Sequence, residues 1–222
     1  MSLRIKFIGH SCFLIEKENI NLLFDPFITG NPVATIKKDD LKANYILVSH
    51  AHNDHLGDAI EIALKQSSKI ISTFEICILA QDKGVESIPG HIGGKINTEF
   101  GFVKFTPAFH GSGIEGGHAS GFLVDFFGIK IYFAGDTGLF GDMKLLEAEK
   151  IDLAFLPIGD TFTMGPKDAV AAVEFIKPRI VIPMHYNTMP SITQHPEDFK
   201  EAVERKTQAL VYIVSPGLDV KI

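Results

Sequence analysis

The stretch Val48-Ser49-His50-Ala51-His52-Asn53-Asp54-His55 decides how the rest of the chain is interpreted. It places three histidines and one aspartate within six positions, directly after an apolar run that predicts a strand at 45–49. Imidazole nitrogen and carboxylate oxygen suit zinc and other divalent first-row metals. A regular strand or helix could not turn all four side chains toward one point, whereas a loop could. The stretch therefore predicts a metal site carried on a loop.

The same stretch has a plainer interpretation, in which it is a polar loop and Asp54 caps the helix that follows. Three clustered histidines make a poor cap, so we favour the metal site. The two roles are compatible, because Asp54 could cap a helix and bind a metal at once.

Three further candidate ligands, His110, Asp136 and His185, each come directly after an apolar, strand-like run. Loops at strand ends are where a rigid scaffold usually carries functional groups. Each residue alone is weak evidence, since a single histidine at a strand end is more often a surface residue. A structural zinc is closed by four protein ligands, whereas a catalytic zinc keeps a position open. The larger set favours catalysis with two metals: His50, His52, Asp54, His55, His110, Asp136 and His185.

Two residues before this stretch are candidates for supporting roles. His10 either faces the site or substrate, which we favour and which makes it a catalytic candidate, or is a turn histidine between two strands. Asp25 precedes Pro26 and either orients a metal-binding histidine through its second ring nitrogen or forms an Asp-Pro turn. Tyr186 and Asn187 follow a predicted ligand and are expected near the substrate.

The remaining histidines and the two cysteines have ordinary interpretations. His91 and His118 are expected in surface loops, with the mouth of the site as the alternative, and His195 at the start of a helix. Cys12 and Cys77 lie among apolar residues and are expected to be small buried side chains and not nucleophiles.

Length and composition set the limits for the whole chain. Its 222 residues predict a single domain, 1–222, and 45% apolar residues allow a sizeable core. The net charge of −6 argues against general nucleic-acid binding. No apolar run is long enough to span a membrane, no signal peptide is evident, and two cysteines favour the cytoplasm. We expect a small-molecule substrate, no nucleic-acid or membrane partner, and leave the oligomeric state open.

The order of expected elements favours an α/β (α+β) fold with two sheets. Closely spaced strands at the start read as an antiparallel meander, which fits poorly with one doubly wound parallel sheet. Two sheets packed face to face, with helices outside, fit the whole pattern. Strands are expected at 4–9, 12–16, 21–25, 45–49, 69–72, 102–107, 121–127, 130–134, 153–157, 180–183 and 209–214, and helices at 58–66, 74–83, 143–149, 167–177 and 196–206. A tight hairpin is expected at 127–129.

Together, the histidine-rich stretch and the three later ligands resemble the metal signature of the metallo-β-lactamase superfamily, over nearly the whole chain. The resemblance implies a four-layer αβ/βα sandwich with the site at one edge. It also implies one metal on His50, His52 and His110, and a second on Asp54, His55 and His185, with Asp136 bridging them.

Other segments resemble particular branches of this superfamily. The segments at 8–13 and 24–26 resemble the branch of L-ascorbate-6-phosphate lactonase and N-acyl-phosphatidylethanolamine phospholipase D. The segments at 156–159, 162–166 and 183–188 are similar to a family of small metal-dependent hydrolases of unassigned substrate.

The function expected is therefore that of a binuclear metal-dependent hydrolase. A metal-bridging hydroxide would attack an ester, lactone, amide or phosphoester of a small, anionic substrate, and Asp54 would both bind metal and orient the nucleophile. Zinc is the first choice of metal, with manganese, nickel and iron as alternatives. The competing classes are an iron-dependent redox enzyme, a nuclease and a non-catalytic binding protein. Diiron oxygen reductases of this superfamily have a similar motif in which Glu stands at the position of His52. The histidine in this chain therefore argues against an iron-dependent redox enzyme.

Overall fold

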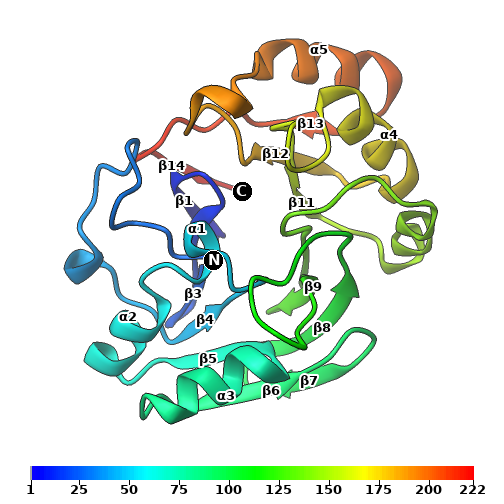
Figure 1. The fold of residues 1–222 in the computed structure, drawn as a ribbon. Helices are drawn as coiled ribbons and strands as arrows, with labels where there is room; N and C mark the ends of the chain where they lie inside the picture. Colours follow the sequence, from blue (N-terminus) through cyan, green and yellow to red (C-terminus); the bar gives the residue numbers. More distant parts are fainter. Residues whose placement is uncertain (1) are drawn as a thin grey trace. The chain divides into compact units, whose positions relative to one another are not determined.

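The computed structural model describes residues 2–222, which divide into two compact units. Unit 1 comprises residues 2–94, 111–119 and 214–222, and unit 2 comprises residues 95–110 and 120–213. Each unit contains one seven-stranded mixed sheet (Figure 1). The two sheets expected from the sequence are therefore present.

The sheet of unit 1 joins an antiparallel meander to a parallel half. Its order is β14-β1-β2-β3-β4-β5-β6. The strands are β1 (Arg4–Gly9), β2 (Cys12–Lys17), β3 (Ile20–Phe24), β4 (Tyr45–Leu47), β5 (Lys69–Thr73), β6 (Ser87–Gly90) and β14 (Asp219–Lys221). The predicted meander of β1, β2 and β3 is confirmed, and β3 to β6 run parallel. The carboxyl ends of β3 to β6 therefore lie at one edge of this sheet.

Short helices connect the parallel strands of unit 1. They are η1 (Lys38–Asp40), α1 (Asn53–Leu56), α2 (Ala59–Gln66) and α3 (Phe74–Asp82). The helical spacing expected at Ala59, Ile62 and Ala63 is confirmed, because α2 buries these three side chains. Helix α3 packs against β5 and β6 (Figure 1).

The sheet of unit 2 has the order β13-β12-β11-β10-β9-β8-β7. The strands are β7 (Lys95–Thr98), β8 (Gly101–Pro107), β9 (Ser120–Phe126), β10 (Ile129–Phe133), β11 (Leu153–Pro157), β12 (Ile180–Met184) and β13 (Leu210–Val211). Strands β7 to β10 are antiparallel neighbours and β10 to β13 are parallel. The expected hairpin is confirmed: Phe126 pairs with Ile129, and Phe127 and Gly128 both have positive φ, as a type I′ turn requires.

The helices of unit 2 are η2 (Gly141–Glu149), α4 (Pro166–Ile176), η3 (Pro190–Ile192) and α5 (Pro196–Lys206). The helix expected at 143–149 is a 3₁₀-helix; it buries only Met143, so no apolar stripe of α-helical period holds it. The strand expected at 209–214 is wrong beyond Val211, because only Leu210 and Val211 pair with β12. Residues from Val214 onward belong to unit 1.

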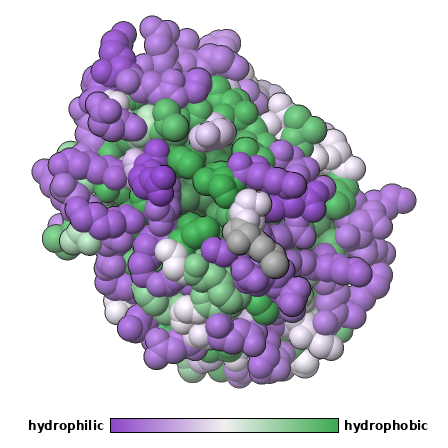
Figure 2. Space-filling view, turned by 180° about the vertical axis from the view of Figure 1, so that it is seen from behind, coloured by the Kyte–Doolittle hydropathy of each residue, from purple (hydrophilic) through white to green (hydrophobic). Residues whose placement is uncertain are grey.

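The surface seen in Figure 2 is mostly hydrophilic, with hydrophobic residues showing in its central part. Scattered exposed apolar residues are normal on a soluble protein, and only those placed beside functional groups call for an explanation. Among the described residues, no helix is both long and apolar enough to cross a membrane.

Candidate metal centre

The histidine-rich stretch of unit 1 is half loop and half helical turn. His50 and His52 lie in the connection after β4, whereas Asp54 and His55 lie in the single turn of α1. The amides of His55 and Leu56 both donate to the carbonyl of His52, which closes this turn. The expectation that a loop carries all four residues is therefore only half right. The alternative role of Asp54 as a helix cap is wrong: His52 holds the N-cap position of α1, and Asp58 that of α2.

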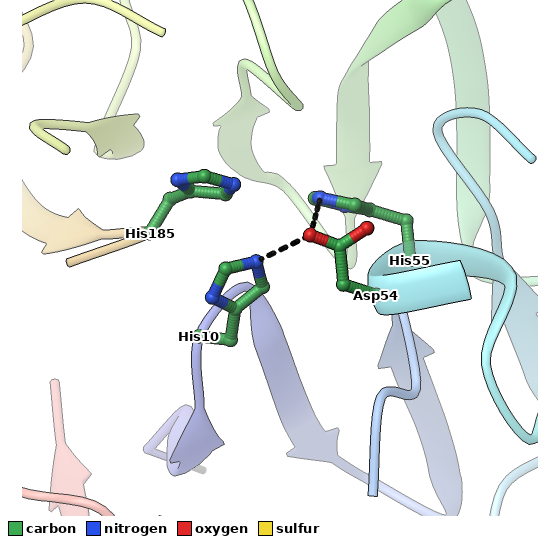
Figure 3. Close-up of side chains that lie close together, drawn as sticks. All are labelled: His10, Asp54, His55 and His185. Carbon is green, nitrogen blue, oxygen red and sulfur yellow. Dashed lines mark hydrogen bonds and ion pairs between the residues drawn. The ribbon is translucent and has the colours of Figure 1, made fainter. Parts of the chain in front are cut away.

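The side chains of this stretch approach one another closely. His50 Nε2 lies 2.9 Å from His52 Nδ1. Asp54 Oδ2 lies 3.9 Å from His55 Nε2. His10, Asp54 and His55 each offer a ligand atom within 4.8 Å of the other two, and they converge in Figure 3. Clustered imidazole nitrogens and a carboxylate are the donor set of a divalent first-row metal, so these residues fit one.

His10 reaches this cluster from the turn between β1 and β2. It is fully buried, and its Nε2 lies 3.1 Å from Asp54 Oδ2 (Figure 3). The edge of its ring contacts Phe27, with centroids 5.7 Å apart. His10 is thus a turn histidine by its backbone, with φ of +61°, and a neighbour of the predicted ligands by its side chain. The structure supports the interpretation that His10 faces the site.

Asp25 is hydrogen-bonded to His55 directly and is linked to His50 through Ser49. It is fully buried and accepts three hydrogen bonds, from the Ser49 amide (2.7 Å), the Ser49 hydroxyl (2.6 Å) and His55 Nδ1 (2.7 Å). The Ser49 hydroxyl also lies 2.9 Å from His50 Nδ1. A carboxylate that accepts from Nδ1 fixes the tautomer in which Nε2 is the metal-binding nitrogen. The orienting role expected for Asp25 is therefore supported for His55.

Ser49 is a further residue of the candidate site that was not predicted from the sequence. Its amide and hydroxyl both reach Asp25, and its hydroxyl also reaches His50. No local sequence pattern indicates this role, because the partner Asp25 lies 24 positions away along the chain.

The segment 111–119 of unit 1 packs over the same stretch. The Ala51 amide donates to the carbonyl of Ser112 at 2.7 Å. A Cβ atom at Gly113 would lie 2.6 Å from the amide nitrogen of His52, closer than real contacts allow. Gly113 also has φ of +71°, so both the close approach and the backbone conformation require glycine. Without a side chain at this position, the segment can press directly against His52.

The three later candidate ligands all belong to unit 2. His110 follows β8, Asp136 follows β10 and His185 follows β12, and these three strands run in the same direction. Their carboxyl ends therefore meet at one edge of the sheet. His185 Nε2 lies 3.0 Å from Asp136 Oδ2, and His110 Nε2 lies 3.6 Å from the same oxygen. Unit 2 thus brings its own predicted ligands together around one carboxylate.

Two backbone features fix His185 and Asp136. His185 has φ of +55°. A Cβ at position 159 would lie 2.3 Å from the carbonyl oxygen of His185, so the loop can approach His185 this closely only with glycine at position 159. Thr137, directly after Asp136, accepts the Phe109 amide on its hydroxyl (3.0 Å) and the Met164 amide on its carbonyl (2.9 Å). The connections after β8 and β11 are therefore both tied to the residue that follows Asp136.

The side chains expected near the substrate differ in their environment. Tyr186 is half-buried, and burial together with Glu197 raises the pKa of its hydroxyl to about 12. The side-chain oxygen of Asn187 accepts a hydrogen bond from the Gln194 amide at 2.8 Å, and this bond joins the two ends of the 187–194 segment.

The remaining histidines and cysteines behave as expected. His91 and His118 are exposed in loops, with ring centroids 5.2 Å apart, and His195 precedes α5. Burial, assisted by the Asp25 carboxylate, raises the pKa of the Cys12 thiol, and burial also raises that of Cys77. Neither thiol is therefore poised as a nucleophile.

Comparison with known proteins gives this arrangement a family. A family model described as a beta-lactamase superfamily domain matches residues 4–185. The chain belongs to the metallo-β-lactamase superfamily. It is 51% identical, over 97% of each chain, to a protein of Natranaerobius thermophilus named UPF0173 metal-dependent hydrolase. A protein of the same description from Methanosarcina mazei is 45% identical over 99% of each chain.

A solved structure agrees with this assignment. Igni18, described as a novel metallo hydrolase from Ignicoccus hospitalis, is 34% identical with a TM-score of 0.94, over 100% of this chain and 99% of its own. The α/β fold of the metallo-β-lactamase type predicted from the sequence is confirmed, and this superfamily member is a metal-dependent hydrolase.

Proposed function

We propose that the ligand sets of both units form one binuclear metal centre. One ion would bind to His50, His52 and His110, a second to Asp54, His55 and His185, and Asp136 would bridge them. On this proposal residues 1–222 act as a single hydrolase domain, because neither unit holds a complete set of ligands. The observation that carries it is the Asp25–Ser49 network, which contacts the Nδ1 atoms of His50 and His55 and so leaves their Nε2 atoms as the proposed ligand atoms.

When bound, divalent ions would supply a water nucleophile at neutral pH and electrostatic stabilisation of the negative charge that develops on the substrate. The residues of the chain prepare this chemistry. Asp25 and Ser49 fix the ring orientations of His55 and His50. Asp54 would bind metal and orient the nucleophile, and His10, whose Nε2 lies 3.1 Å from Asp54 Oδ2, would hold that carboxylate in position.

The substrate proposed is a small anionic ester, lactone or phosphoester. Two divalent ions bring about four positive charges, and Asp54 and Asp136 offset only two of them. The local field therefore attracts a carboxylate or phosphate although the whole chain carries −6. Long nucleic acids need several lysine or arginine contacts over an extended surface, and the sequence offers only isolated pairs such as Lys37-Lys38.

The proposed setting follows from the same features. Zinc is the first choice of metal for nitrogen and carboxylate ligands, with manganese, nickel and iron as alternatives. Two buried, unbridged cysteines, Cys12 and Cys77, favour the reducing cytoplasm.

The test is to purify the protein without added metal, measure its metal content, and load it with Zn²⁺, Mn²⁺ or Ni²⁺. A panel of phosphodiesters, lactones and thioesters is then assayed beside structured RNA and single-stranded DNA, at low and moderate salt. We expect turnover of small anionic substrates that depends on metal and is lost in Asp136→Ala. Robust cleavage of nucleic acid without turnover of any small substrate would refute the proposal.

A further inference from the structure

Two exposed phenylalanines of unit 2 lie in the connections that follow β8 and β11. Phe109 directly precedes His110 and is 66% exposed. Phe162, 54% exposed, lies in the connection after β11, the strand between β10 and β12. Because β8, β10, β11 and β12 run in one direction, both phenylalanines lie at the edge of the sheet where Asp136 and His185 lie.

The loops that carry these two side chains are hydrogen-bonded to the segment after Asp136. The Phe109 amide donates to the Thr137 hydroxyl at 3.0 Å, and its carbonyl accepts from the Gly138 amide at 3.2 Å. The ring of Phe109 rests against Phe140, with centroids 5.1 Å apart and planes tilted by 55°. The loop of Phe162 is tied to the same point, because the Met164 amide donates to the Thr137 carbonyl. The backbone segments that carry the two exposed rings are thus both hydrogen-bonded to Thr137, the residue after Asp136.

We infer that Phe109 and Phe162 determine substrate specificity by contacting an apolar acyl or aryl group beside the bond that is cleaved. Exposed aromatic surface is costly to leave in water, and small-molecule sites combine such surface with a few polar or metal groups. Here the metal centre would bind the reacting acyl or phosphoryl group, and the phenylalanines would contact the carbon chain attached to it. This inference rests on the proposed hydrolysis and narrows its substrates to amphipathic anions.

The test uses O-acyl glycolates, in which the ester and the carboxylate stay constant while the acyl group grows from acetyl to hexanoyl. For the metal-loaded wild type, kcat/KM should rise about twofold to fourfold per added methylene group, the range expected for partial to full burial. Phe109→Ala and Phe162→Ala should each at least halve the slope of log kcat/KM against chain length. Both variants keep the backbone bonds to Thr137, because main-chain atoms make them.

Leu210→Ala is the matched control. Leu210 is also 54% exposed in unit 2, but it pairs with Ile180 at the start of β12, roughly 16 Å along the strand from His185. This variant should keep the wild-type slope. A flat wild-type series, or an equal loss of slope in Leu210→Ala, would overturn the inference.

A binding measurement separates this inference from the proposed reaction. Acetate, butyrate and hexanoate are titrated calorimetrically into the metal-loaded protein and the three variants. Affinity that rises with chain length and falls in the phenylalanine variants supports the apolar subsite, even if no glycolate ester is hydrolysed. Turnover of acetyl glycolate, with flat series in both experiments, would uphold the hydrolase and reject the subsite.

Discussion

Replacing Asp25 with asparagine tests whether this residue orients a metal ligand. The change keeps the size of the side chain, and asparagine tolerates the positive φ of +38° at this position. Only one side-chain oxygen remains. If this oxygen still accepts from the Ser49 amide, the side-chain NH₂ of the asparagine faces the Ser49 hydroxyl and His55 Nδ1. In the wild type both of these groups bond to Asp25 Oδ2.

An amide N–H can be accepted only by a deprotonated Nδ1, and this moves the imidazole proton of His55 to Nε2, the proposed ligand atom. Metal binding at Nε2 then requires the proton to move back to Nδ1, which costs free energy. Loss of such a supporting bond typically weakens metal affinity about 10- to 100-fold, or about 1.4–2.8 kcal/mol. Competition against a chromophoric chelator measures this change directly.

Asp58→Asn is the matched control in the same unit. Asp58 is also buried and also accepts several hydrogen bonds, from the Ile28 and Thr29 amides, the Thr29 hydroxyl and Lys38. None of these partners is a predicted ligand, so this variant should lose stability but keep its metal affinity. Wild-type affinity in Asp25→Asn, or an equal loss in both variants, would refute the orienting role.

Three further predictions concern the metals and the stability of unit 1. Elemental analysis of protein reconstituted separately with Zn²⁺, Mn²⁺ and Ni²⁺ should find two ions per chain; at most one under saturating conditions for every metal would contradict the binuclear centre. Asp136→Ala should weaken the binding of both ions, and His110→Ala mainly the binding of one, as measured by stepwise metal titration. Unchanged metal content in Asp136→Ala would show that Asp136 does not bridge the two ions. Burial alone would raise the pKa of Asp58, but bonds from Thr29 and Lys38 hold that pKa below its usual value. Its contribution to stability is therefore present above about pH 4 and is lost as the pH falls through the lowered folded pKa. Urea unfolding should accordingly show wild type and Asp58→Asn diverging above pH 4 and converging in acid; a gap that persists in acid would contradict this.

Much of the secondary structure could be predicted because the relevant patterns are local. The apolar strands and the amphipathic helix α2 follow from spacing alone, and the hairpin follows from Gly128 beside Phe127. Strands β6, β7 and β14 were missed because they are short strands whose side chains are mostly not buried, so their alternation is weak. The single turn of α1 was missed for a similar reason: its few residues carry no helical period.

The supporting contacts of the candidate site are harder to predict than the candidate ligands. The histidine-rich stretch is visible because its residues are adjacent. The bonds from Asp25 to Ser49 and His55 span 24 and 30 positions, and no local pattern specifies them. The sequence could therefore suggest Asp25 only as one of two alternatives, and it gave no reason to single out Ser49.

Three residues of the candidate site, His10, Asp25 and His185, occupy left-handed backbone conformations, with φ of +61°, +38° and +55°. Side chains other than glycine and asparagine hold this conformation at a cost of order 1 kcal/mol each. Glycine would relieve this backbone cost, but at Asp25 it would also remove the carboxylate that accepts three buried hydrogen bonds. A glycine selected for heat resistance at any of these positions would remove a side chain of the candidate site, so a thermostabilised library should be screened for metal content as well as for melting temperature.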